Sequence, residues 1–344
     1  MAKRFVFIRI ATLIAACFLM ASSEARAVEP KDPNWTLVAE NAAWSPRDSC
    51  GECVLNGRMY LIGGWLNSFE DGPRDVWSSA DGKDWKLETN AAPWKHADLS
   101  TTLVFNKRMW LMGGWHGGRL PHASASNEVW SSSDGANWKQ ETAKAGWSPR
   151  LGAAGVVFKN RMWIFGGLAK YYFGDDKDLH NDVWSSADGV QWERATPAAP
   201  WPARAYHGAA ALGDRMYVFS GGNYLPGYKA FHDVWSSTDG KEWVRETEKA
   251  PWEGRIWFTA EVYRGRMWMI GGWSNNPFRN WNDVWHSADG KHWEQLKTES
   301  VWKVRHEHSS FVLDDKLWVT AGNSPPLVND VWQLRLPESW NPTK

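Results

Sequence analysis

Three adjacent polar residues, His306, Glu307 and His308, bring acid–base groups together in one short segment. On a β-strand, His306 and His308 would point to the same side, which permits an acid–base pair or two metal ligands. Their spacing supplies no third ligand, so the sequence predicts no metal site and no cofactor. We take His308 as a candidate catalytic residue, and His306 and Glu307 as candidate ligand-binding residues.

Two further residues, His207 and Glu261, stand out because the chain repeats itself and most equivalent positions hold small or apolar residues. The residues equivalent to Glu261 are Cys53, Leu103, Val156, Ala210 and Phe311. An acid at such a position is either buried and paired, or has a raised pKa and acts as a catalytic acid or base. His207 and Glu261 are therefore the other two catalytic candidates.

Arginine follows a tryptophan by three residues at five places, which are Arg47, Arg150, Arg204, Arg255 and Arg305. Each repeat also holds one acid at a fixed place: Asp75, Glu128, Asp182, Asp233, Asp283 and Asp330. The arginines could form a ring of guanidinium groups that binds a carboxylate or another anion. Alternatively, each could pair with the acid of its own repeat, and a feature that recurs in this way usually serves the repeat itself.

An eleven-residue segment, Asp75–Trp85, organises the chain. It returns as Glu128–Trp138, Asp182–Trp192, Asp233–Trp243 and Asp283–Trp293, and a sixth copy starts at Asp330. Val-Trp-Ser-Ser is typical of a short strand, and Asp-Gly is a strong hairpin signal. One such hairpin cannot bury its own tryptophans, whereas six side by side can, so the sequence predicts a repeat protein.

Each repeat contains four strand signals, but the last one lacks its fourth. Residues 34–38 (Asn-Trp-Thr-Leu-Val) match the missing strand and precede Trp44 as Trp85 precedes Trp94. The N-terminal segment should therefore pair with Asp330–Leu336 and remove the open edge of the last sheet. The predicted fold is all-β, with six four-stranded antiparallel units closed into a ring.

The double glycine after the second strand, Asn-Asp-Val-Trp in the third and a tryptophan in the fourth resemble Kelch repeats. Such repeats form the central domain of galactose oxidase and many exported bacterial propellers. The resemblance covers about residues 34–336 and implies a six-bladed β-propeller. It concerns the repeat only, because the crosslinked Cys–Tyr pair and two histidine ligands of the radical-copper oxidases are not identifiable here.

In a propeller of this type, the long variable loops share one face with the start of each innermost strand, and such loops usually carry binding sites. Tyr206, Trp257, Trp115 and Trp273 belong to this face, near the channel mouth with His306 and Glu307. Their aromatic faces suit sugar rings or peptide side chains. They could instead cap the mouth of the barrel.

Cys50 and Cys53 form a C-x-x-C motif in a predicted strand. Residues i and i+3 of a straight strand face opposite ways, although a bulge at Gly51 would permit a structural disulfide. Redox catalysis is disfavoured, because no helix N-terminus is predicted beside the pair. The sequence leaves open whether these two cysteines are bonded.

The 344-residue chain has no formal net charge, which argues against nucleic-acid binding. Residues 1–27 resemble a signal peptide, with Lys3 and Arg4 before an apolar stretch and Ala25-Arg26-Ala27 as the cleavage site. Residues 28–344 would form one exported domain, periplasmic or secreted. A lipid anchor at Cys17 is the alternative to cleavage, and no later segment is apolar enough to span a membrane.

These features predict a monomeric binding module that holds a glycan, an anionic small molecule or a protein segment on its loop-rich face. The alternative is an enzyme. Exported six-bladed Kelch proteins include mutarotases of sialic acid. This resemblance implies that the protein could be a sugar mutarotase or epimerase that acts on an anionic sugar. A structural interaction scaffold is a third possibility, and fold alone does not decide among them.

Overall fold

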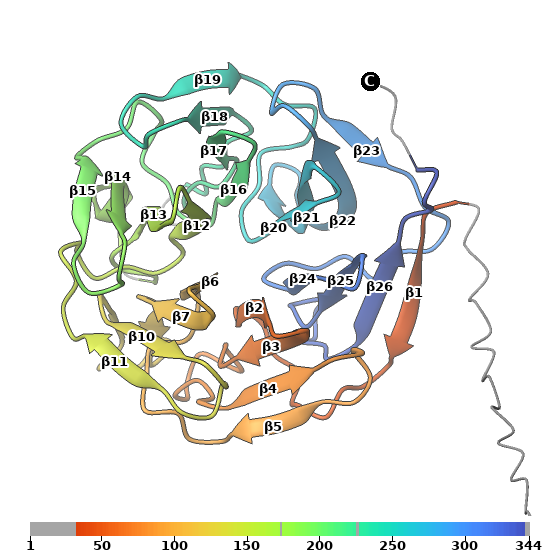
Figure 1. The fold of residues 1–344 in the computed structure, drawn as a ribbon, viewed down its shortest axis with the longest axis horizontal. Helices are drawn as coiled ribbons and strands as arrows, with labels where there is room; N and C mark the ends of the chain where they lie inside the picture. The colour runs from red at the N-terminus through yellow and green to blue at the C-terminus, as the bar shows by residue number, and fades with distance from the viewer. Residues whose placement is uncertain (1–31, 173, 225–226, 341–344) are drawn as a thin grey trace, which may run out of the picture.

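The computed structural model describes residues 32–172, 174–224 and 227–340. Six four-stranded antiparallel sheets surround a central axis, as Figure 1 shows. The predicted signal peptide 1–27 and the alternative anchor at Cys17 lie outside the described residues. No helix in the described ranges has the length and apolar character needed to cross a membrane.

The first three blades follow one another along the chain. Blade 1 contains β2 (Gly51–Leu55), β3 (Arg58–Ile62), β4 (Val76–Ser79) and β5 (Lys86–Thr89). Blade 2 contains β6 (Thr101–Phe105), β7 (Arg108–Met112), β10 (Val129–Ser132) and β11 (Lys139–Thr142), and its loop forms β8 (Trp115–His116) and β9 (Ser124–Ala125). Blade 3 contains β12 (Ala154–Phe158), β13 (Arg161–Leu168), β14 (Leu179–Ser186) and β15 (Glu193–Thr196), with a short 3-10 turn at Asp176–Asp178.

The remaining blades complete the ring. Blade 4 contains β16 (Gly208–Leu212), β17 (Arg215–Phe219), β18 (Val234–Ser237) and β19 (Val244–Thr247). Blade 5 contains β20 (Thr259–Tyr263), β21 (Arg266–Asn275), β22 (Phe278–Ser287) and β23 (Glu294–Leu296). Blade 6 contains β24 (Ser309–Leu313), β25 (Lys316–Thr320), β26 (Val331–Arg335) and β1 (Asn34–Ala39).

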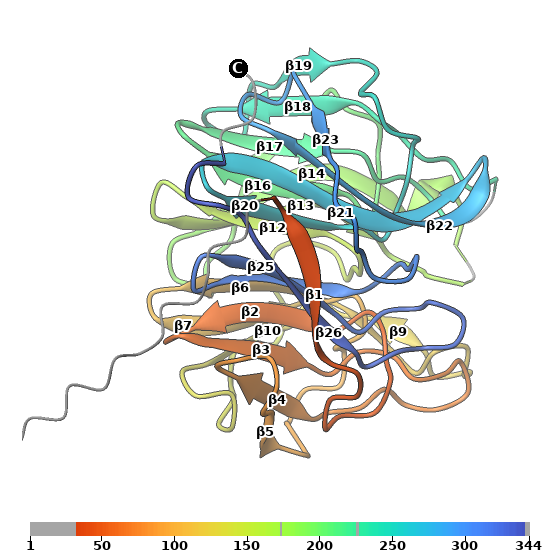
Figure 2. The same cartoon turned by 90° about the vertical axis from the view of Figure 1, so that its right-hand side faces the viewer.

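The sixth blade joins segments from opposite parts of the sequence, as the sequence led us to expect. β1 runs antiparallel to β26, with Leu37 opposite Trp332 in the register, and Figure 2 shows the two strands together at the edge of the disc. Trp35 packs edge-on against Trp302 with their ring centroids 4.3 Å apart. Trp35 therefore takes the place that the hairpin tryptophans take in the other blades.

Each fixed residue of the repeated Ser-x-Asp-Gly turn makes a contact that explains its type. In blade 1, the Ser79 hydroxyl accepts a hydrogen bond from the Gly82 amide, and the Asp81 carboxylate accepts bonds from the next two amides. Gly82 has a φ of +72°, and an added Cβ would lie 2.4 Å from the Trp318 ring of blade 6. Glycine is thus required for the turn and for contact with the neighbouring blade.

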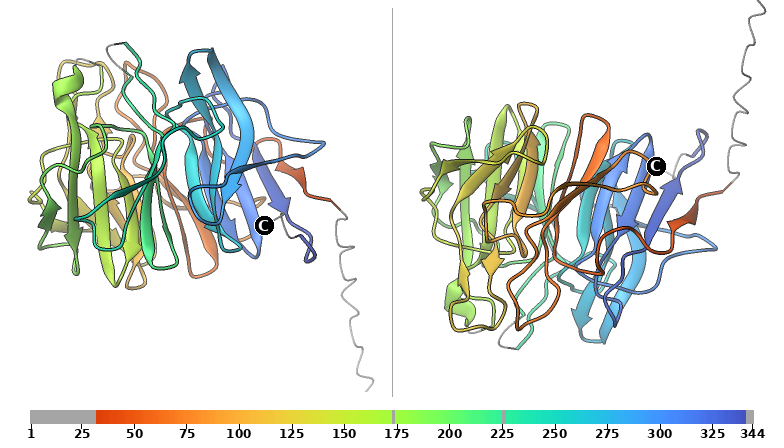
Figure 3. Two further views of the ribbon diagram at one scale, coloured as in Figure 1. Left: turned by 90° about the horizontal axis from the view of Figure 1, so that it is seen from above. Right: turned by 90° about the horizontal axis from the view of Figure 1, so that it is seen from below.

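The core lies mainly between the blades. One cluster of buried apolar side chains fills each of the six spaces between neighbouring sheets. A seventh cluster, containing Trp115, Tyr206, Trp257 and Trp273, covers the loop-rich face. Figure 3 shows the sheets side by side in edge views of the disc, and in Figure 2 the β21–β22 hairpin and β9 project from the same side.

Candidate functional site

A ring of left-handed residues surrounds the axis on the loop-rich face. Each lies two residues before an innermost strand, with φ between 51° and 59°. The ring consists of Ser49, Leu99, Gly152, Tyr206, Trp257 and Glu307. Non-glycine residues in this conformation cost roughly 1–3 kcal/mol each and occur often at functional sites.

Main-chain hydrogen bonds link these residues from blade to blade. The Leu99 amide donates to the Ser49 carbonyl, the Gly152 amide to Leu99, and the Tyr206 amide to Gly152, at 2.7–3.1 Å. The Ser49 amide donates to the Glu307 carbonyl at 2.9 Å, which connects blade 1 to blade 6. We call this ring the axial belt. It fixes the backbone at six places where the blades carry different side chains.

A cavity of about 600 Å³ opens above the axial belt. Its aromatic lining comes from four blades: Trp65, Tyr171, Tyr172, Tyr224, Tyr228, Trp257, Trp273 and Phe278. Many of these rings touch one another. Tyr224 lies 4.8 Å from Trp257 and 5.1 Å from Tyr228 between ring centroids. The walls therefore form a continuous aromatic surface of the size that small-molecule sites have.

Three buried carboxyl groups, Asp48, Asp98 and Glu307, form the floor. The Ser49 hydroxyl donates to Asp48 Oδ1 at 3.1 Å, and the Tyr171 hydroxyl donates to Glu307 Oε1 at 3.3 Å. Neither carboxyl oxygen of Asp98 has a hydrogen bond of normal geometry to the described residues, although Ser49 lies nearby. The floor is thus rich in hydrogen-bond acceptors with few donors.

Burial controls the protonation of this floor. It raises the pKa of Asp48 to about 7, against the smaller effect of hydrogen bonds from Ser49 and Asn323. Burial also raises the pKa of Asp98, and the neighbouring Asp48 raises it further. Glu307 has a raised pKa because it is buried and lies near Asp48 and Asp98. The raised pKa values favour the protonated forms of these carboxyl groups, which can donate hydrogen bonds as well as accept them.

Two arginines, Arg119 and Arg279, lie at the rim of the cavity. The Arg119 guanidinium lies 4.4 Å from the Tyr172 ring centroid, and that of Arg279 lies 3.9 Å from the Trp281 centroid. Within the described part of the chain, neither is ion-paired with a carboxylate. The rim is therefore cationic, whereas the floor is acidic.

The cavity brings together four residues predicted from the sequence: His306, Glu307, Trp257 and Trp273. His306 Nδ1 lies 2.7 Å from Asn280 Oδ1, and His306 Nε2 lies 3.5 Å from Glu307 Oε2. Burial lowers the pKa of His306 to about 4, so its ring is neutral at pH 7. Trp115, by contrast, is buried in the cluster on the loop-rich face and does not line the cavity, which matches the capping alternative.

A second, smaller cavity of about 200 Å³ lies below the axial belt and contains His207, His308 and Tyr206. Burial lowers the pKa of both histidines to about 3. His308 Nε2 lies 3.1 Å from the Thr259 hydroxyl oxygen. The expectation that His306 and His308 line one site was wrong, because the left-handed backbone at Glu307 separates them into different cavities.

Glu261 lies on β20, where the Ser310 hydroxyl donates to its Oε1 at 2.8 Å. Burial raises the pKa of Glu261 to about 7. It also raises the pKa of Glu52, and the nearby Glu261 adds to that effect. Glu261 lines neither cavity, and its partner is a serine hydroxyl rather than the base that the paired alternative predicted, so its pKa stays raised.

The five arginines pair with acids inside their own blades. Each Nη1 lies 2.5–2.7 Å from the first oxygen of the acid at the start of the third strand. The pairs are Arg47–Asp75, Arg150–Asp182, Arg204–Asp233, Arg255–Asp283 and Arg305–Asp330. In blade 4, Arg204 also donates to the Ser220 carbonyl at the position of the double glycine. We call these pairs the blade staples, and none of their arginines lines the cavity.

The remaining sequence expectations concern the cysteines and the floor. Cys50 and Cys53 are unbonded and pack in different inter-blade clusters, as opposite faces of a strand require.

Sequence reasoning missed Asp48 and Asp98. Both lie four residues after an opening tryptophan, where blades 3 to 5 have Leu151, Ala205 and Ile256. That departure from the repeat was the available signal.

Comparisons with known proteins agree with this architecture. A solved structure titled "Structure of YjhT" superposes with a TM-score of 0.67 at 13% identity, covering 88% of this chain and 98% of that one, which shows the fold. The flagellar outer-arm dynein alpha chain of Chlamydomonas reinhardtii is 35% identical over 136 residues, which are 37% of this chain but 3% of the dynein. The model of the KLHDC2/KLHL20/DRC7 Kelch-repeats domain matches residues 171–342, half of the chain. The chain therefore belongs to the Kelch-repeat family.

Proposed function

We propose that this propeller is a binding module that holds a sugar ring in the aromatic cavity on its loop-rich face. A Kelch propeller is in general a ligand-binding or protein-interaction module, and the choice of a glycan rests on the cavity itself. The observation that carries it is the combination, in one space of about 600 Å³, of aromatic walls with a floor of three carboxyl groups.

The two surfaces match the two sides of a sugar. The apolar face of a pyranose ring packs on aromatic side chains such as Trp257 and Tyr224, which are already held by their neighbours. Its hydroxyl groups can donate to Asp98, whose two carboxyl oxygens have no hydrogen bond of normal geometry to the described residues. A hydrogen-bonded ligand would reduce the cost of burying these acceptors.

The rim favours an acidic group on that sugar. Arg119 and Arg279 already lie over aromatic rings, which limits the conformations of their side chains. A carboxylate at the rim would meet these guanidinium groups, while a carboxylate at the floor would meet three other carboxyl groups. We therefore infer an acidic sugar with its hydroxyls toward the floor. Export to the periplasm or beyond, as the N-terminal sequence predicts, would place the protein among extracellular glycans.

A glycan array followed by isothermal calorimetry tests this proposal. We expect one class of acidic glycan to bind, and Tyr224→Ala and Glu307→Gln to weaken that binding at least tenfold. Phe69→Ala is the matched control, because Phe69 is an exposed aromatic residue on a blade 1 loop that does not line the cavity. The proposal is wrong if no glycan is retained, or if both cavity variants bind as well as Phe69→Ala does.

A second candidate function is catalysis of sugar mutarotation, and the raised pKa values of the floor favour it. Opening a sugar ring needs an acid and a base near the anomeric carbon, and a carboxyl group such as Asp48, whose pKa is raised to about 7, serves well in either role. Exchange spectroscopy by NMR on an acidic sugar would detect faster anomer exchange. If the wild-type rate equals the uncatalysed rate while binding persists, the protein is a binding module alone.

A further inference from the structure

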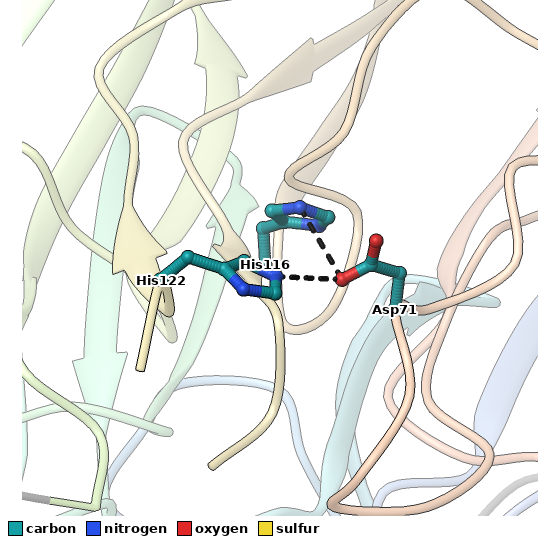
Figure 4. Close-up of side chains that lie close together, drawn as sticks. All are labelled: Asp71, His116 and His122. Atoms are coloured by element: carbon teal, nitrogen blue, oxygen red, sulfur yellow. Dashed lines mark hydrogen bonds and ion pairs between the residues drawn. The ribbon is translucent and has the colours of Figure 1, made fainter. Parts of the chain in front are cut away.

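Three potential metal ligands converge outside the aromatic cavity, on two neighbouring loops. Asp71 lies on the loop between β3 and β4 of blade 1, whereas His116 and His122 lie on the β8–β9 segment of blade 2. Figure 4 shows both rings directed at the Asp71 carboxylate. His122 Nε2 is 2.9 Å and His116 Nε2 is 3.5 Å from the same oxygen, Oδ1.

These separations suit coordination to one ion. Ligands about 2.0–2.1 Å from a tetrahedral zinc ion lie about 3.3 Å apart, and the two distances to Asp71 Oδ1 fall on either side of that value. The three ligating atoms all lie within 4.8 Å of one another. Three corners of a tetrahedron would be complete once His122 shifts away from Asp71 and its nitrogen lies about 3.3 Å from that of His116.

The chemistry of the ligands also selects the kind of ion. Two imidazoles and one carboxylate suit zinc and its neighbours in the first transition series, whereas calcium and magnesium prefer oxygen ligands only. The side chains of Asp71 and His122 are 58% and 55% exposed, so water can reach a fourth position. His116, at 13%, anchors the cluster against the fold.

We propose that Asp71, His116 and His122 bind a divalent transition-metal ion of the zinc class. The ion would join the loops of blades 1 and 2, which already meet where the Arg119 amide donates to the Ser68 carbonyl at 2.8 Å. Arg119 and Ser68 both line the rim of the cavity, so the ion would fix one side of its entrance. This site differs from the one weighed in the sequence, which involved His306 and His308, and it does not depend on the proposed sugar binding.

Calorimetric titration of the chelator-treated full chain with zinc chloride tests the proposal, after removal of any histidine tag. We expect one zinc ion per chain and a higher melting temperature with the ion. His122→Ala and Asp71→Asn should each weaken binding at least about tenfold, since even the loss of a group that only supports a ligand costs 10–100-fold. Cobalt(II) should give the visible absorption of a four-coordinate site in the wild type but not in His122→Ala or Asp71→Asn.

His292→Ala is the matched control. His292 also lies beside an aspartate, with Nδ1 2.7 Å from Asp289 Oδ2, and its side chain is exposed, but no second histidine joins that pair in the described residues. This variant should bind zinc as the wild type does. The proposal fails if zinc does not saturate at one ion per chain, or if His122→Ala and Asp71→Asn bind zinc with wild-type affinity.

Discussion

Two sets of carboxyl groups with little exposure to solvent have opposite surroundings in this protein. The blade staples give each acid a bidentate arginine: Asp233, for example, accepts from Arg204 Nη1 at 2.7 Å and from Nη2 at 2.9 Å. The floor acids Asp48, Asp98 and Glu307 have no arginine partner among the described residues. The staples recur in five blades, whereas the floor acids occur where the blades differ.

The pKa values record the same contrast. Burial alone would raise the pKa of Asp233, but the hydrogen bond and charge of Arg204 outweigh it and hold that pKa below its usual value. At the floor nothing outweighs burial, so the pKa values rise. Each of the five pairs would leave a poorly solvated charge in its blade if one partner were lost, whereas a carboxyl group without an arginine at the axis is free to react or bind.

The largest effect is expected from breaking a staple. Arg204→Ala would leave the Asp233 carboxylate buried without its partner, and the free energy of unfolding should fall by about 3–5 kcal/mol. Urea unfolding at pH 7 measures this. Arg194→Ala is the control, because Arg194 is an exposed arginine on the outer strand of blade 3, stacked over Trp184. Equal losses in the two variants would contradict the structural role of the staples.

Neutralising a floor acid should have a smaller effect, and one of opposite sign. An acid whose pKa is raised by folding destabilises the protein as the pH rises from its unfolded pKa toward its folded pKa. Asp98→Asn removes that penalty, so the variant should gain on the order of 1 kcal/mol relative to the wild type at pH 8 and little at pH 4. Unfolding curves at both pH values check it. A gain that does not grow with pH would show that Asp98 is already ionised at no cost.

The smallest effect should come from the rim. Arg279 is exposed, so Arg279→Ala should leave stability unchanged and weaken binding of an acidic sugar only about fivefold at low salt. The difference from the wild type should shrink as salt is added. Calorimetry at two salt concentrations, with Arg194→Ala as the control, measures it. A salt-independent difference would indicate that Arg279 acts through packing on Trp281.

The sequence predicted the fold because the fold depends on what the blades share. Local physical chemistry explains the Asp-Val-Trp strand, the Asp-Gly turn and the hairpin tryptophan to which Trp35 corresponds. These features recur in the chain, so the explanation of one copy applies to the others. Element ends were less predictable. β21 ends at Asn275 and β22 begins at Phe278, so both strands are longer than the repeat predicts. The residues of the connecting loop continue the hydrogen-bonded pairing of the two strands.

The site was only partly predictable, because it depends on distances between blades. Trp257, His306 and Glu307 were found as departures from the repeat, and Trp273 was found as an aromatic residue of a variable loop. The choice between an anion-binding ring and internal staples needed the Arg–Asp distances. Asp71 and His116 are far apart in the sequence, and only the packing of two loops brings them together.

The axial belt has a consequence for how such a protein acquires new ligands. The main chain at its six positions is tied to its neighbours by amide and carbonyl groups that every residue except proline possesses. The side chain at each position can therefore differ from blade to blade, within the limits that the left-handed backbone sets. Natural selection, or a protein engineer, can exchange the chemistry at the centre of the disc one blade at a time while the scaffold stays intact.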